Sequence, residues 1–286
     1  MKRILAILFS AMLVFSLAAC GGNTPPASNV EGDGNSVEDG TPPPATSGNF
    51  RSIEEIQASG ELIMLTNAAF PPFEYVEGTD PAGVDVDVAR AIAADLGVEL
   101  RVVDMDFDGL IAALKSGRGD LIAAGMTIRE DRLENVDFTV EYVTSAQYIV
   151  MASGSGYATL EDLAGCRIGV QLGTTGDFLI DDAINLEEGE LYDTGASMSQ
   201  YRTALEAAQD LLNGRLDAVV IDRHPATAIA AQNDSLITSA DAISESESYA
   251  IAVDKGNEAL LAAANETLNR LISDGTVDQF LVDHTS

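Results

Sequence analysis

The sequence predicts an α/β protein with two units, and three observations indicate this class. From residue 50 to the end, short apolar runs typical of buried strands alternate with segments of helical periodicity. The connections between them are short, which favours sheets rich in parallel strands. The chain has 286 residues, enough for two ordinary domains with substantial cores.

The first unit shows the alternation clearly. Apolar residues recur at helical spacing over 85–96, and Gly97 follows as a helix stop. Glu130 lies three residues beyond Thr127, which predicts a helix that starts at Thr127 with a capping box. The elements expected before it are helices over 53–58, 85–96 and 110–115 and strands over 62–66, 98–103 and 121–123.

A second unit begins near Ala146 and repeats the pattern. Gly214 is expected to end one of its helices, and Pro225 suits the first position of another. The expected strands cover 147–151, 167–171, 216–221 and 249–253. Helices are expected over 177–184, 201–212 and 258–273, and two further helices are expected to start at Thr159 and at Pro225. A last turn is expected around Phe280.

Charge and cysteine content exclude several classes of function. The chain carries 15 Lys and Arg against 46 Asp and Glu, a net charge of −31, so we expect no nucleic-acid partner and no binding to anionic membrane surfaces. Cys166 is expected to be a partly buried structural thiol, because no disulfide framework is possible with Cys20 as the one other cysteine. His224 and His284 are the only histidines, so a zinc site or a Cys/His nucleophile is poorly supported, and we expect no metal and no cofactor.

The N-terminus has the pattern of an export signal. Lys2 and Arg3 precede an apolar run over 4–19, and the small residues before Cys20 complete a signal peptide over 1–19. Leu17-Ala-Ala-Cys20 resembles a bacterial lipobox, which implies cleavage before Cys20 and lipidation of its sulfur; the alternative is an ordinary signal peptide with an incidental cysteine. Residues 20–50 are rich in Gly, Pro, Ser and Thr and predict a disordered tether.

Two strand-to-helix turns indicate a ligand site. The turns over 124–127 and 173–176 would direct backbone N–H groups beyond the ends of their strands, where open α/β sheets bind ligands. No Gly-Lys-Ser/Thr follows, so neither is a phosphate loop. Arg132 could receive a carboxylate and Asp222, at the end of an apolar strand, an ammonium group, which together match a zwitterion. Taken singly, such an Arg is more often a surface residue and such an Asp often a helix cap.

Several sequence blocks follow one another in a distinctive order from about Leu62 to the C-terminus. They include Asn67-Ala-Ala-Phe-Pro-Pro-Phe-Glu-Tyr75, Gly83-Val-Asp-Val-Asp-Val88, Ala124-Gly-Met-Thr-Ile-Arg-Glu-Asp-Arg132, Ile168-Gly-Val-Gln-Leu-Gly-Thr-Thr175 and Gly214-Arg-Leu-Asp-Ala-Val-Val-Ile-Asp222. In these blocks the sequence resembles the amino-acid-binding proteins of ABC importers that form family 3 of the bacterial extracytoplasmic solute-binding proteins.

The resemblance implies a type II periplasmic-binding-protein-like fold with two α/β lobes joined by two hinge strands. Lobe 1 would comprise 51–144 and 247–286, and lobe 2 would comprise 145–246. The implied protein is a monomeric, lipid-anchored, extracytoplasmic receptor, not an enzyme, that binds a free L-amino acid and delivers it to the membrane subunits of an ABC permease. A lyase of the cyclohexadienyl dehydratase type and a ligand-presenting sensor component remain alternatives.

By position, the resemblance also implies roles for single residues. Arg132 would hold the α-carboxylate together with N–H groups of Thr127 and of Thr174 or Thr175. The Gly125 carbonyl, the Thr127 hydroxyl and Asp222 would bind the α-ammonium. The rings of Phe70 and Phe107 would line the pocket for the side chain of the bound amino acid. The complete candidate set is Asn67, Phe70, Phe107, Ala124, Gly125, Thr127, Arg132, Gln171, Thr174, Thr175 and Asp222.

Two amides suggest the substrate class. Asn67 lies where several family members that bind cationic amino acids carry aspartate, and an amide cannot compensate a buried cation. Gln171 faces the same space from the other lobe. We therefore expect a neutral polar amino acid such as glutamine, asparagine, serine or cystine, although Glu74, Tyr75 and Met126 could reverse this preference.

Overall fold

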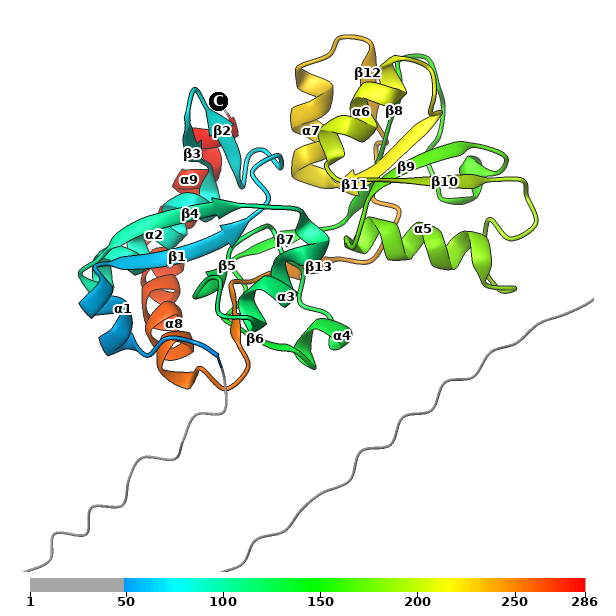
Figure 1. Cartoon of the computed structure of the whole chain (residues 1–286). Coiled ribbons are helices and arrows are strands. Elements are labelled where there is room, and N and C mark those ends of the chain that lie inside the picture. Colours follow the sequence, from blue (N-terminus) through cyan, green and yellow to red (C-terminus); the bar gives the residue numbers. More distant parts are fainter. Residues whose placement is uncertain (1–48, 286) are drawn as a thin grey trace, which may run out of the picture. The chain divides into compact units, whose positions relative to one another are not determined.

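The computed structural model of the protein describes residues 49–285 (Figure 1). The predicted signal peptide, Cys20 and the predicted tether as far as residue 48 lie outside the described residues. Within residues 49–285, no helix has the length and apolar composition needed to cross a membrane.

The first of two five-stranded sheets has the order β4-β1-β5-β14-β6. Strand β1 is parallel to β4 and β5, whereas β14 returns late in the chain and is antiparallel to β5 and β6. The bounds are β1 (Glu61–Thr66), β4 (Glu99–Asp104), β5 (Leu121–Ile122), β6 (Val136–Phe138) and β14 (Ala252–Asp254). We call this sheet and its helices lobe 1.

Alternating side chains of β1 explain how helices cover both faces of this sheet. Leu62 and Met64 join the large core with α2 (Val84–Leu96), α8 (Glu258–Ser273) and α9 (Thr276–Thr285). Leu65 points to the other face and joins a smaller core with α3 (Leu110–Lys115). The helix α1 (Ile53–Ser59) precedes β1, and a capping box at Ser52 caps its N-terminus.

The second sheet has the order β10-β9-β11-β8-β12, with β9 parallel to β10 and β11 and with β8 antiparallel to β11 and β12. Its bounds are β8 (Gln147–Ala152), β9 (Arg167–Gln171), β10 (Ser197–Tyr201), β11 (Ala218–Asp222) and β12 (Leu236–Thr238), and its helices are α5 (Thr175–Asn185), α6 (Ala204–Leu212) and α7 (Arg223–Ala231). We call this sheet and its helices lobe 2.

Two short strands connect the lobes. Strand β7 (Val143–Ser145) leads from lobe 1 into lobe 2, and β13 (Glu247–Tyr249) leads back. The two strands pair antiparallel, with Glu247 opposite Ser145 and Tyr249 opposite Val143. They stand where two hinge strands were expected; the boundaries at 144/145 and 246/247 remain predictions.

Several predicted elements need correction. The capping box at Thr127 is wrong: helix α4 (Glu130–Leu133) begins after Arg129, without a side-chain cap. Tyr201 ends β10, which was not predicted, and Thr203 caps α6. The helix expected from Thr159 is a 3-10 turn over Glu161–Leu163. The strand expected over 249–253 is divided between β13 and β14. The helix expected to start at Pro225 begins at Arg223. The strands β2 (Tyr75–Glu77), β3 (Asp80–Ala82) and β12 were also not predicted.

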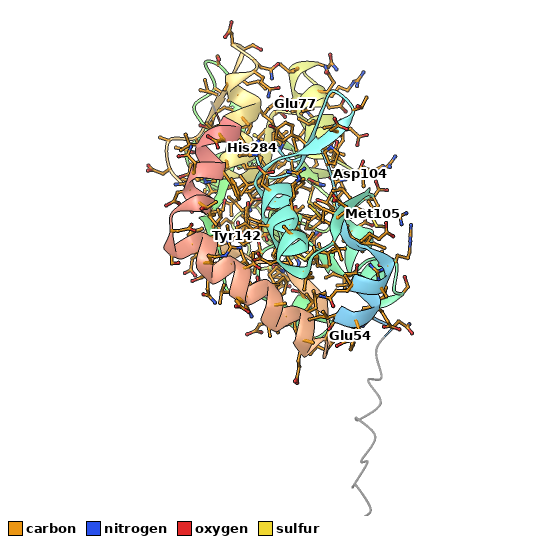
Figure 2. The ribbon with its side chains drawn as sticks, turned by 90° about the vertical axis from the view of Figure 1, so that its left-hand side faces the viewer. Glu54, Glu77, Asp104, Met105, Tyr142 and His284 are labelled. Atoms are coloured by element: carbon orange, nitrogen blue, oxygen red, sulfur yellow. The ribbon has the colours of Figure 1, made fainter. Side chains whose placement is uncertain are left out.

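The C-terminal helix is longer than the expected last turn around Phe280. Figure 2 shows α9 in red, ending with His284 near the β2–β3 hairpin. The imidazole Nε2 of His284 lies 2.8 Å from Asp87 Oδ2, and its Nδ1 lies 3.0 Å from the Tyr75 hydroxyl. These contacts fasten the end of the described chain to lobe 1.

Candidate amino-acid site between the lobes

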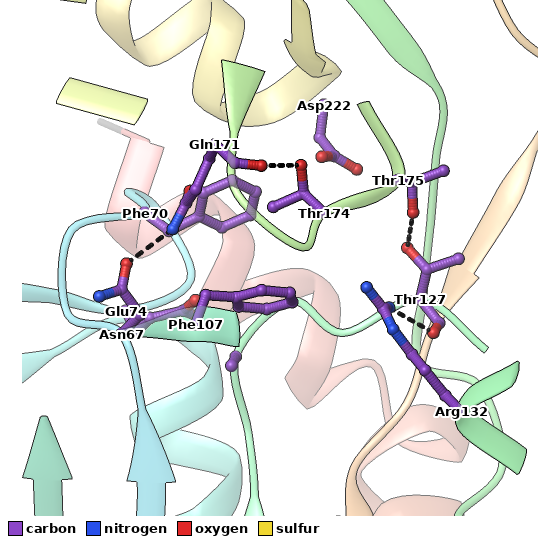
Figure 3. A pocket seen from close by; sticks show the side chains of 12 residues that line it. Asn67, Phe70, Glu74, Phe107, Thr127, Arg132, Gln171, Thr174, Thr175 and Asp222 are labelled. Atoms are coloured by element: carbon purple, nitrogen blue, oxygen red, sulfur yellow. Dashed lines mark hydrogen bonds between the residues drawn. The ribbon is translucent and has the colours of Figure 1, made fainter. Parts of the chain in front are cut away.

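All the candidate residues lie around one cavity between the lobes. Twelve residues line it, namely Asn67, Phe70, Glu74, Phe107, Ala124, Gly125, Thr127, Arg132, Gln171, Thr174, Thr175 and Asp222. In Figure 3 the rings of Phe70 and Phe107 lie between two polar ends, one with Asn67 and Gln171 and the other with Arg132, Thr127 and Thr175. The predicted set is thus brought together by elements far apart in the sequence.

Arg132 supplies a buried cation at one end of this cavity. Its side chain is only 4% exposed, and two of its N–H groups donate to backbone carbonyls, to Thr127 at 2.7 Å and to Gly173 of lobe 2 at 3.1 Å. These bonds fix the plane of the guanidinium. Burial lowers the pKa of Arg132 to about 10, and the group is therefore still charged at neutral pH.

Thr127 is positioned by the hinge strand rather than by a helix cap. Its backbone forms an antiparallel bridge to Tyr249, and the bonds of this bridge use Met126 and Ile128, so the N–H of Thr127 points away from β13. Its hydroxyl donates to Glu247 Oε2 at 2.7 Å and accepts from the Thr175 hydroxyl at 3.2 Å. A hydroxyl chain therefore joins α5, the Thr127 turn and the hinge.

Asp222 supplies an anion from the opposite lobe. It is 6% exposed, at the end of a fully buried strand, and its Oδ1 accepts from the Tyr249 hydroxyl at 2.5 Å. Burial, followed by the charge of Glu247, raises the pKa of Asp222 to about 7. A cation beside this carboxyl would reverse that shift, so the site is suited to an ammonium group.

Gly125 permits the backbone to pass close to the aromatic wall. Its φ is +51°, and a Cβ there would lie 2.8 Å from Cε1 of Phe70. Its N–H donates to Asp85 Oδ2 at 2.8 Å, which holds the turn in place. The Phe107 ring lies across the cavity, with its centroid 5.4 Å from the guanidinium carbon of Arg132.

The amide end of the cavity also bridges the lobes. Gln171 Nε2 donates to Asn67 Oδ1 at 2.9 Å and to the carbonyl of Arg202 at 3.1 Å, while Asn67 Nδ2 donates to the Met105 carbonyl. Thr174 caps α5 and donates to the Gln171 carbonyl at 2.7 Å. The two predicted specificity residues therefore contact each other.

Glu74 and Glu247 are two acidic residues that the candidate set did not contain. Glu74 lines the cavity and is 1% exposed; burial, followed by the charge of the neighbouring Asp85, raises its pKa well above the ordinary value. Both effects disfavour the ionised form of this carboxyl. Its place in the block Asn67–Tyr75 could have marked it, but its pairing with Asp85 is not visible in the sequence.

Other contacts join the lobes around the rim of the cavity. The guanidinium of Arg202 forms three bonds of 2.7–3.1 Å to the carboxylate of Asp106. The guanidinium carbon of Arg129 lies 3.8 Å from the ring centroid of Phe178 on α5. The lobes are thus in contact on both sides of Arg132 and the Phe107 ring.

Comparisons with known proteins agree with this architecture. The family model described as "Bacterial extracellular solute-binding proteins, family 3" matches residues 62–284. The arginine-binding extracellular protein ArtP of Bacillus subtilis is 33% identical over 283 residues, which cover 98% of this chain and 96% of ArtP. The L-cystine-binding protein TcyJ of Escherichia coli K12 is 32% identical over 231 residues, covering 79% of this chain and 82% of TcyJ.

A solved structure extends the likeness to the fold. An ancestral arginine-binding protein bound to glutamine has 38% sequence identity and a TM-score of 0.71, and the match covers 79% of this chain and 97% of that chain. Both the sheet topology and this match identify a type II periplasmic-binding-protein-like fold. The chain belongs to family 3 of the bacterial extracellular solute-binding proteins.

Proposed function

We propose that this protein captures one free L-amino acid outside the membrane and delivers it to the permease subunits of an ABC importer. The observation that carries the proposal is the pair Arg132 and Asp222, a guanidinium and a carboxyl that are 4% and 6% exposed and line the same cavity from different lobes. A zwitterion satisfies both at once, and buried charges without such partners are costly.

The bound amino acid would span the cavity. Its carboxylate would accept from Arg132 and from N–H groups of Thr127 and of Thr174 or Thr175, and its ammonium would donate to Asp222, the Gly125 carbonyl and the Thr127 hydroxyl. Micromolar binding requires about −8 kcal/mol. A ligand of about ten heavy atoms can supply this under a ceiling near −1.5 kcal/mol per atom.

For the side chain, we propose a neutral polar amino acid. Asn67 and Gln171 offer amide donors and acceptors at the far end of the aromatic walls. The carboxyl that also lines the cavity, Glu74, is buried beside Asp85, and both raise its pKa well above the ordinary value, so the charge that would balance a guanidinium is disfavoured there. Glutamine fits this set best, since its amide can pair with both.

Arginine is the second candidate, because ArtP is named as an arginine-binding protein and Glu74 lines the cavity. A thermal-shift screen of the free amino acids followed by calorimetry decides between the two. Tightest binding of glutamine, asparagine, serine or cystine supports the neutral class. Tightest binding of arginine or lysine overturns it, and a screen with no binding amino acid overturns the receptor function.

Replacing Asn67 with Asp tests whether this position sets the charge preference. The carboxylate of Asn67→Asp would face the side chain of the ligand, so we expect the ratio of arginine to glutamine affinity to rise about tenfold or more. The matched control is Asn135→Asp, a change at a half-buried amide that accepts a hydrogen bond from Lys115. An unchanged ratio in calorimetric competition would remove Asn67 from the specificity determinants.

The anchoring and the absence of catalysis complete the proposal. A lipid on Cys20 would hold a monomer at the outer face of the membrane, and Cys20→Ser should release the protein into the medium. We propose binding without catalysis, which incubation with arogenate or prephenate tests, because an aromatic product would indicate a lyase. Whether the ligand is presented to a sensor is answered by the signalling response of a strain that lacks the permease.

A further inference from the structure

Glu247 occupies the junction of the two lobes and the hinge. It lies on β13, and its carboxylate accepts from the Thr127 hydroxyl of lobe 1 at 2.7 Å and from Nε2 of Gln147 of lobe 2 at 2.6 Å. It is not among the twelve residues that line the cavity. Both of its donors come from segments that adjoin the ligand site, so Glu247 can act on that site through them.

Glu247 and Asp222 belong to one cluster of side chains. Gln147, which donates to Glu247, is the backbone partner of Asp222 across the β8–β11 pair, and Tyr249, two residues beyond Glu247 on β13, donates its hydroxyl to Asp222 at 2.5 Å. Two carboxyls held in one such cluster favour a state in which one of them carries a proton. Arg132 and Glu74 are the other ionisable groups whose titration responds to Asp222.

The side chain of Gln147, beside Glu247 and Asp222, has a buried oxygen without a hydrogen-bond partner among the described residues. Oε1 of Gln147 is buried and has no hydrogen-bond partner, although Nε2 of the same amide donates to Glu247. A buried acceptor beside two carboxyls provides a further contact for a donor that enters the site. The cluster of Asp222, Glu247 and Gln147 is therefore rich in hydrogen-bond acceptors, which favours a proton shared among them.

We propose that Glu247 is a positioning residue for amino-acid capture, which shares one proton with Asp222 in the ligand-free protein and releases that proton when the α-ammonium group arrives. The inference rests on the proposed function, because it assigns the ammonium to Asp222. The O–H bond of the shared carboxyl breaks, the proton passes to the buffer, and the ammonium N–H groups take its place between the acceptors.

The shared proton makes affinity depend on pH in a definite direction. Burial and Glu247 raise the pKa of Asp222 to about 7, whereas an ammonium beside it would lower this pKa. Below pH 7 the free protein holds the proton and must lose it to bind. The dissociation constant should therefore rise roughly tenfold for each pH unit below about 6.5.

Isothermal titration calorimetry of the protein with L-glutamine and L-arginine as probes tests the inference. Titrations at pH 6.5 in phosphate and in imidazole, buffers with different ionisation enthalpies, should show about 0.5–1 proton released per bound amino acid. In Glu247→Gln the amide cannot share a proton with Asp222, so the release should fall below about 0.3 and the pH profile should flatten. Glu245→Gln, a change at an exposed carboxyl two residues away, should keep the wild-type values.

The outcomes separate the inference from the function. Binding without proton release by the wild-type protein, or an unchanged pH slope in Glu247→Gln, overturns the inference and leaves the receptor function standing. Absence of binding by either probe and by the other free amino acids overturns both. The wild-type measurement needs no variant, so a misfolded Glu247→Gln protein does not prevent the test.

Discussion

At the scale of single residues, Arg132 has two tasks that the same geometry serves. Its bonds to the Thr127 and Gly173 carbonyls hold its plane and join the lobes. Its remaining N–H groups keep the planar arrangement of donors that matches the two oxygens of a carboxylate. A lysine ammonium cannot reproduce this arrangement. The charge of Asp131, followed by those of Asp222 and Glu247, supports its protonated form against burial.

Arg132→Ala should therefore weaken amino-acid binding without unfolding the protein. A charge-assisted hydrogen bond contributes about 1.5–3 kcal/mol, so we expect a loss of roughly tenfold to hundredfold in affinity by calorimetry. Arg215→Ala is the matched control, because Arg215 is exposed and pairs with Asp210 away from the cavity. Equal affinities of wild type and Arg132→Ala would rule out the carboxylate role.

The candidate residues could be predicted because each belongs to a local motif, whereas their partners could not. Thr127 and Glu130 have the spacing of a capping box, but the Thr127 hydroxyl donates to Glu247, which lies 120 residues later. Glu74 and Asp85 belong to two separate motif blocks, and only folding shows that they meet. Hydrogen-bond partners distant in sequence are set by the fold and not by local pattern.

At the scale of elements, strong periodicity led to correct predictions and weak periodicity did not. The apolar face of α2 fixed its bounds to within one residue, and α8 was predicted over its whole length. The edge strand β10 was missed because its side chains are mostly polar and give no apolar run, and β12 was missed because it has only three residues. They are strands because they pair with β9 and β8. Pairing across the sheet overrides weak local preference.

The turn at Gly125 gives a test at this scale. Gly125→Ala must hold a side chain at φ +51° and move the Phe70 ring, so we expect a loss of about 1–3 kcal/mol in unfolding free energy and weaker amino-acid binding. Gly60→Ala is the matched control, since Gly60 has φ +76° but open space around its Cβ position. The control should lose some stability and keep its affinity. Wild-type affinity in Gly125→Ala would show that the Phe70 contact does not shape the site.

At the scale of the whole molecule, the contacts between lobes determine how a ligand changes the protein. Asn67–Gln171, Thr127–Thr175 and Arg132–Gly173 all cross between lobes at the cavity. Periplasmic binding proteins close around their ligands by a hinge motion, and a ligand favours closure only through contacts that the open form lacks. The amino acid proposed here would add such contacts beside those that the protein already makes.

The rim pair Arg202–Asp106 should slow the escape of the ligand. Its side chains are 70% and 42% exposed, so it contributes at most about 1 kcal/mol, and Asp106→Asn should raise the dissociation rate roughly twofold to fivefold at low salt. Asp217→Asn is the control, because the Arg167–Asp217 pair is similarly exposed but lies within lobe 2. Stopped-flow rates that are equal for both variants would contradict a role for the rim pair.

Buried carboxyls set the response of the ligand-free protein to pH. Burial raises the pKa of Asp85 to about 6 and that of Asp222 to about 7, and it raises the pKa of Glu74 well above its ordinary value. The folded state therefore binds these protons more tightly than the unfolded chain does. This contribution to stability is complete below the unfolded value of about 4 and is lost as pH rises through 6 and 7.

We accordingly expect the free energy of unfolding, measured with urea, to be lower at pH 8 than at pH 5. Repulsion within a chain of net charge −31 acts in the same direction, so the measurement belongs in about 0.5 M salt, which screens surface charges over a few ångströms. Asp222→Asn should reduce the difference, whereas Asp234→Asn, a change at an exposed carboxyl, should not. Saturating amino acid should also reduce it, because the ammonium favours ionised Asp222. Greater stability at pH 8 in the ligand-free protein would show that these carboxyls are ionised at no cost to the fold.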